Sequence, residues 1–102
     1  MNFEIYDKVK WHFPEGEGCK SLEDALLHFK VIMNWLYKNN LLSEFGSSLY
    51  RTKYGEDFSI TSEMLNDRGN QLLSKCYDGW QKTIIYGNEP STESLDKKIS
   101  EL

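Results

Sequence analysis

Three residues in the first third of the chain could do acid–base or nucleophilic chemistry: His12, Cys19 and His28. Histidine changes charge near neutral pH and can act as a general base. A cysteine becomes a nucleophile when a neighbouring base takes its proton. A small enzyme or ligand-binding protein that uses these residues near the loop at 14–20 is therefore one hypothesis. The spacing does not bring the three together, and we expect each histidine to lie at the surface or in an interface.

Other motifs of catalysis or metal binding are missing from the sequence. It contains no C-x-x-C, no H-x-x-x-H and no Asp-rich calcium loop. The glycine-rich loop carries Glu15 and Glu17, which would repel a phosphate group. The sequence therefore predicts no catalytic residue, no metal site and no cofactor, and we expect a protein that is not an enzyme.

Composition and charge predict one compact, acidic domain. The 102 residues include 16 Asp and Glu against 12 Lys and Arg, a net charge of −4. No basic cluster offers a nucleic-acid surface, and no apolar run reaches the roughly 18 residues of a membrane span. We see no signal peptide, so we expect a cytoplasmic protein. Residues 88–102 are a tail that docks loosely or frays, and whether Cys19 and Cys76 pair stays open.

The segment from Ser21 to Asn39 predicts a helix that is apolar on two sides. Ser21 is a suitable N-cap, and the paired asparagines at its end tolerate a left-handed cap. At 100° per residue, one broad face is apolar. A second set of three apolar residues, which we call the outer ridge, lies opposite. The broad face consists of Leu22, Ala25, Leu26, Phe29, Ile32, Met33 and Leu36, and the outer ridge of Leu27, Val31 and Trp35.

The remaining elements are a strand, a hairpin and two further helices. Residues 3–13 alternate between apolar and polar, which indicates a half-buried strand interrupted at Asp7. A hairpin is predicted over 49–53 and 57–60, and 41–50 reads as a short helical turn or a loop. A long amphipathic helix should run from about 62 to 84, where Gly69 on its apolar side predicts close passage of the first helix. Residues 91–102 predict a short C-terminal helix. The fold class is α+β, with two main packed helices, a small antiparallel sheet made of the N-terminal strand and the short hairpin, and that short helix.

The outer ridge poses the main functional question. Either the N-terminal strand or the C-terminal tail covers it, or it is held out for a partner. Our leading hypothesis is a non-enzymatic protein-interaction module that binds another protein or a second copy of itself. An acidic inhibitor or immunity-type protein that blocks a basic partner is its most concrete form. The candidate interface consists of Leu27, Val31 and Trp35, with Glu23, Asp24 and His28 at its rim.

Overall fold

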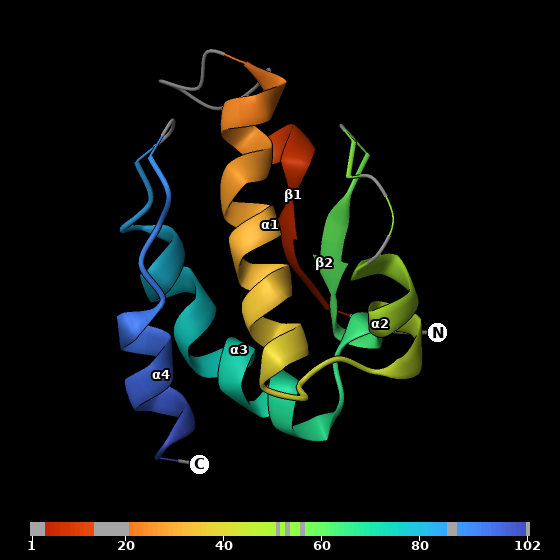
Figure 1. The fold of residues 1–102 in the computed structure, drawn as a ribbon, viewed down its shortest axis with the longest axis vertical. Coiled ribbons are helices and arrows are strands. Elements are labelled where there is room, and N and C mark those ends of the chain that lie inside the picture. Colours follow the sequence, from red (N-terminus) through yellow and green to blue (C-terminus); the bar gives the residue numbers. More distant parts are fainter. Residues whose placement is uncertain are drawn as a thin grey trace.

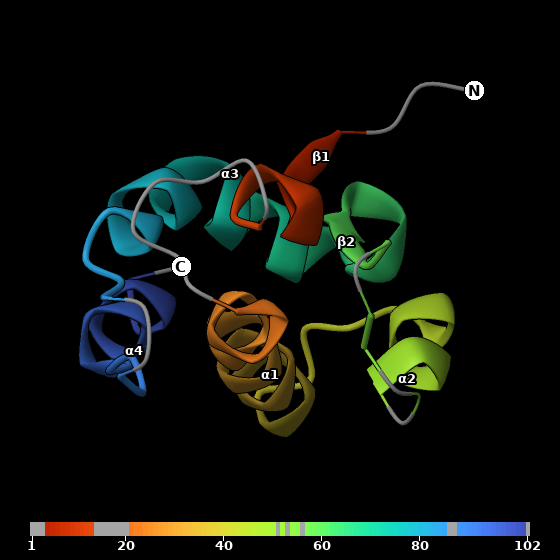
Figure 2. The same cartoon turned by 90° about the horizontal axis from the view of Figure 1, so that it is seen from above.

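The computed structural model describes residues 4–13, 21–50, 52, 54–55, 57–85 and 88–101. It confirms an α+β fold in which helices pack around a two-stranded antiparallel sheet. In Figures 1 and 2, α1 lies between α4 and α2 and faces α3 and β1 across the core. The elements in chain order are β1 (Ile5–Lys8), the 3-10 turn η1 (Val9–Trp11), α1 (Leu22–Lys38), α2 (Glu44–Tyr50), β2 (Ser59–Thr61), the 3-10 turn η2 (Ser62–Met64), α3 (Asp67–Gln81) and α4 (Glu93–Ile99).

The first helix begins and ends as its capping residues predict. The Ser21 side chain accepts a hydrogen bond from the Asp24 backbone N–H at 3.2 Å. Asn39 is the C-cap, and Asn40 follows it with φ of 57°, in the left-handed region that asparagine tolerates. Because α1 has neighbours on three sides (Figure 2), its broad apolar face is buried except at Leu22, which is half-buried. Its second apolar side also meets other elements (Figure 2).

The sheet pairs β1 with β2, and its details differ from the prediction. Asp7 pairs with Ile60 across the sheet, and the chain turns into η1 from Val9 onward. The alternation therefore ends early: Trp11, expected inside, is 48% exposed, whereas His12, expected outside, is buried. The first strand of the predicted hairpin is absent at Leu49 and Tyr50, which belong to α2.

The second long helix starts later than predicted. η2 precedes it, and Leu65 then adopts an extended conformation and bridges to Leu42. Asn66 caps α3 by accepting a hydrogen bond from the Gly69 N–H at 2.9 Å, so α3 has 15 residues. The predicted apolar face is confirmed. Its buried members on α3 are Gly69, Leu72, Leu73, Tyr77 and Trp80, with Cys76 half-buried beside them.

Another stretch of backbone passes close to Gly69, as predicted. It is the segment that follows the first helix, not the helix itself. A Cβ on residue 69 would clash with the carbonyl oxygen of Leu41, in the segment that leaves α1. Leu41 is itself buried, and its carbonyl accepts a hydrogen bond from the Asn66 N–H at 3.0 Å. The Leu41 backbone therefore has little freedom to move away from Gly69.

Gly69→Ala should destabilise the protein although alanine favours helices by about 1 kcal/mol over glycine. The added methyl group must displace the Leu41 backbone, and overpacking of this kind costs about 1–3 kcal/mol. Gly79 is the matched control because it lies in the same helix, and no described residue comes within 4 Å of the position where its Cβ would be. Gly79→Ala should raise the midpoint of urea unfolding, and Gly69→Ala should lower it. Equal midpoints for the two variants would contradict the close passage.

The C-terminal helix docks on the body of the protein. Leu95 of α4 is 1% exposed and joins the main core. Ahead of α4, the Ser91 carbonyl accepts a hydrogen bond from the Trp80 indole N–H at 2.7 Å. Residues 88–101 thus lie beside α1, on the side opposite α2 (Figure 2). Among the helices that the structure describes, none has both the length and the apolar character of a bilayer-spanning segment.

Candidate functional site

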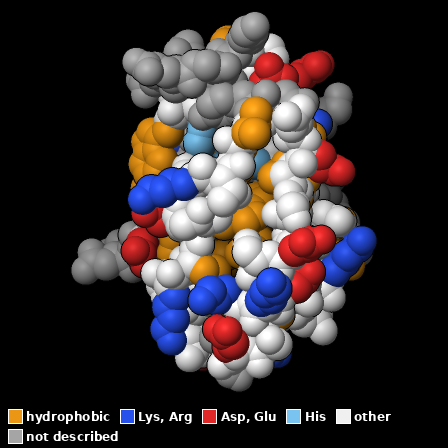
Figure 3. Space-filling model, turned by 90° about the vertical axis from the view of Figure 1, so that its left-hand side faces the viewer, with side chains coloured by type: hydrophobic (Ala, Val, Ile, Leu, Met, Phe, Trp, Pro, Cys, Tyr) orange, Lys and Arg blue, Asp and Glu red, His pale blue; other side chains and the backbone are white. Residues whose placement is uncertain are grey.

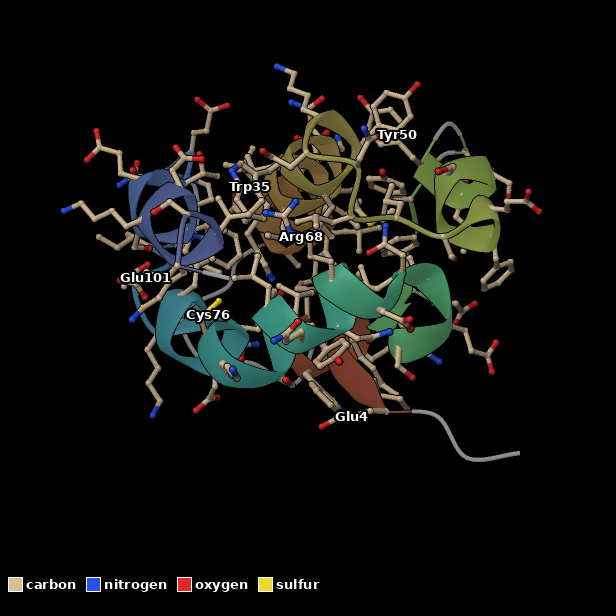
Figure 4. All side chains as sticks on the ribbon, turned by 90° about the horizontal axis from the view of Figure 1, so that it is seen from below. Glu4, Trp35, Tyr50, Arg68, Cys76 and Glu101 are labelled. Atoms are coloured by element: carbon tan, nitrogen blue, oxygen red, sulfur yellow. The ribbon has the colours of Figure 1, made fainter. Side chains whose placement is uncertain are left out.

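The outer ridge of α1 is covered at the end that carries Trp35. This side chain is 6% exposed, and its indole N–H donates a hydrogen bond to the Asp96 carboxylate at 2.8 Å. Figure 4 shows it between α1 and α4. Val31 is half-buried against the core, and Leu27 is half-buried. The C-terminal segment therefore covers this end of the ridge. The sequence had left open whether the N-terminal strand or the C-terminal tail would be the cover.

A groove remains along the rest of the ridge, between α1 and residues 89–96. Its volume is about 710 Å³, within the range of small ligand sites. The α1 groove, as we call it, combines apolar side chains with lysines of α1 and carboxylates of residues 89–96. It is lined by Leu27, Lys30, Val31, Asn34, Trp35, Lys38, Asn39, Glu89, Pro90, Thr92 and Asp96. Glu23 is exposed and Asp24 is half-exposed, and neither belongs to this lining.

The two histidines come together in the interior, around Asp7. Asp7 is fully buried, and its Oδ1 lies 2.7 Å from His12 Nε2. Its Oδ2 lies 2.9 Å from His28 Nε2 and accepts a hydrogen bond from the Tyr77 hydroxyl at 2.6 Å. The Lys8 backbone N–H also donates to Oδ1 at 2.9 Å. These four side chains, Asp7, His12, His28 and Tyr77, are the histidine cluster.

The cluster holds Asp7 as a carboxylate. Burial by itself raises the pKa of Asp7, but the hydrogen bonds from His12, His28 and Tyr77 outweigh it, so the pKa lies below its usual value. A carboxylate only accepts hydrogen bonds, so both histidines donate to it from Nε2. The pKa of Tyr77 is raised well above 10 by burial and by the adjacent Asp7 charge, so its hydroxyl stays protonated.

Three parts of the chain that are distant in sequence build this cluster: the N-terminal segment, α1 and α3. Asp7 comes from β1, His12 from the turn after η1, His28 from α1 and Tyr77 from α3. His28 is 1% exposed and faces the core, not the rim of an interface. Sequence reasoning missed the roles of Asp7 and Tyr77. The signal was Asp7 on the apolar side of a predicted strand, because a charge on a buried face needs partners.

The arrangement gives limited support to nucleophilic catalysis. Cys19 lies outside the described residues. Cys76 is half-buried, and burial raises the pKa of its thiol, which disfavours the reactive thiolate. In the part of the chain that the structure describes, the second ring nitrogen of His28, Nδ1, is buried and has no hydrogen-bond partner, so that atom does not reach a substrate. The cluster is better suited to holding a charge than to moving a proton.

No protein-family model, curated protein or solved structure matches this chain. The class that the structure defines is a small α+β domain with a buried histidine–aspartate cluster and an open groove beside its central helix.

Proposed function

We propose that this protein is a non-enzymatic binding module that holds a short extended segment of a basic partner protein in the α1 groove. An acidic inhibitor or immunity-type protein is the most concrete form of this proposal. The observation that carries it is the groove itself, which follows the ridge on which the sequence places the contact residues. The protein's net charge of −4 favours a basic partner, since opposite net charges speed encounter.

The lining of the groove suits a peptide chain. Leu27 and Val31 form an apolar strip that remains partly exposed, and Leu27 is the ridge residue least involved in the core. Lys30 and Lys38 stand on the α1 side, and Glu89 on the opposite side offers a carboxylate to a basic side chain. Apolar contact with flanking polar groups is the usual composition of a peptide-binding site.

A peptide display library tests the proposal because it samples many sequences and does not require an identified partner. Panning on the intact protein should enrich peptides that combine Lys or Arg with an apolar residue. Leu27→Ser should weaken their binding about tenfold or more, because burial of one leucine side chain contributes about 1.5–3 kcal/mol. Ile85→Ser is the matched control, since Ile85 is 65% exposed and does not line the groove.

Amide chemical shifts with a bound peptide locate the contact. They should change along α1 and residues 89–96. Shifts confined to other elements, an acidic consensus among the peptides, or equal affinity of the two serine variants would contradict the proposal. A second copy of the chain is the competing occupant, and a stable dimer in light scattering at tens of micromolar would favour it.

A further inference from the structure

The histidine cluster carries a buried negative charge whose ion-pair partners, among the residues that the structure describes, are histidines alone. Asp7 is fully buried and ionised, and it pairs with His12 and His28. The second ring nitrogen of His28, Nδ1, is buried and has no hydrogen-bond partner among the described residues. Buried charges in proteins are paired or bind metal ions.

We propose that Asp7, His12 and His28 bind a divalent transition-metal ion, with Zn²⁺ as the best fit. One carboxylate oxygen and one ring nitrogen from each histidine lie within 4.8 Å of one another. Zn²⁺ with bonds of about 2.0–2.2 Å places its ligand atoms roughly 3.3 Å apart. Asp7 now contacts His12 through Oδ1 at 2.7 Å and His28 through Oδ2 at 2.9 Å, so an ion bound to one of these oxygens would replace the direct contacts with both histidines.

The chemistry of the donors selects the ion. Two imidazoles with one carboxylate suit Zn²⁺ and its neighbours, whereas Ca²⁺ and Mg²⁺ prefer oxygen ligands alone. Three protein ligands leave a fourth position open. The Gln81 side-chain amide lies next to His12, with its nitrogen 3.2 Å from His12 Nε2. Turned so that its oxygen faces the cluster, this amide is a candidate for the fourth ligand.

Surrounding groups already hold the carboxylate in place. The Tyr77 hydroxyl and the Lys8 backbone N–H both donate hydrogen bonds to Asp7. In known metal sites, similar hydrogen bonds from surrounding groups orient the ligating carboxylate. To bind through Nε2, His28 must move its proton to Nδ1. That atom is without a partner in either neutral form, so the move creates no additional unsatisfied atom. Figure 3 shows a little histidine surface, which indicates that the cluster lies near solvent.

Zn²⁺ titration of the full chain by calorimetry, after removal of bound metal, tests the proposal. The background should be Cys19→Ser with Cys76→Ser, because thiolates also bind zinc. We expect one ion per chain. His12→Asn should abolish binding, whereas Tyr77→Phe keeps all three ligands and should weaken it about 10–100-fold. Loss of binding in the thiol-free background, or His12→Asn that binds like the parent, would overturn the proposal.

A second measurement needs no variant that risks unfolding. Long-range ¹H–¹⁵N spectra of the wild-type histidine rings show which ring nitrogen carries the proton. One equivalent of Zn²⁺ should remove the proton from Nε2 of both rings and leave it on Nδ1. Co²⁺ in place of Zn²⁺ should give the visible absorption of a low-coordinate site. Unchanged Nε2 signals at saturating Zn²⁺ would overturn the proposal even if the ion binds elsewhere. This outcome leaves the peptide groove untouched, because the two sites share no residue.

Discussion

Replacing Asp7 with alanine is expected to lower the free energy of unfolding by about 3–5 kcal/mol, the usual cost of breaking a buried charged pair from one side. The side chain accepts hydrogen bonds from His12, His28 and Tyr77, and all four groups are buried. Alanine leaves these donors without an acceptor, and each unsatisfied buried group costs about 1–3 kcal/mol. Urea unfolding followed by circular dichroism measures the loss.

The control for Asp7→Ala is Asp57→Ala. Asp57 forms an ion pair with Lys10 at 3.0 Å, but their side chains are 82% and 59% exposed. Exposed pairs of this kind contribute little, so the change should stay within about 0.5 kcal/mol. If the two alanine variants lost the same stability, the cluster would have no special role in holding the fold together.

The pH dependence of the free energy of unfolding provides a second test of the role of Asp7. Its pKa is lower in the folded protein than the ordinary value of 3.8. The stabilisation is therefore fully present above about pH 4 and is lost as the pH falls through the lower, folded pKa. The stability difference between wild type and Asp7→Ala should shrink below pH 4. A difference that grew on acidification would mean that the folded pKa is raised instead.

Trp35→Ala is expected to cost about 3–5 kcal/mol, the range for truncating a large buried aromatic side chain. The ring is buried between α1 and α4, and its N–H binds Asp96. Trp11 is the matched control, because it is 48% exposed. Trp11→Ala should change the free energy of unfolding by about 0.5 kcal/mol or less.

Trp35→Phe separates the two contributions of this side chain. It keeps an aromatic ring between the helices and removes the hydrogen bond to Asp96. That bond contributes about 1.5–3 kcal/mol at most, because its acceptor is charged but exposed to solvent. We therefore expect a smaller loss than for alanine. A near-neutral thermal shift for Trp35→Ala would mean that the C-terminal helix does not cover the ridge, and the whole ridge would then be open to a partner.

The sequence by itself determined the features that depend on neighbouring residues. Ser21 and Asn39 end α1 through bonds that span three or four residues, so they can be read locally. The same holds for the apolar face of α3, because side chains three and four positions apart share one side of a helix. The apolar spacing also predicted the short C-terminal helix, but the sequence left open whether it docks or frays, and the structure shows that it docks.

Only the tertiary structure decided what depends on residues far apart. It paired β1 with β2 and placed Leu49 and Tyr50 in α2 instead of a strand, and it delayed the start of α3 through the bridge between Leu42 and Leu65. It also joined Asp7 to His28 and Tyr77 across 21 and 70 positions. A buried carboxylate must find hydrogen-bond donors wherever the packed chain brings them, and spacing along the sequence does not encode that meeting.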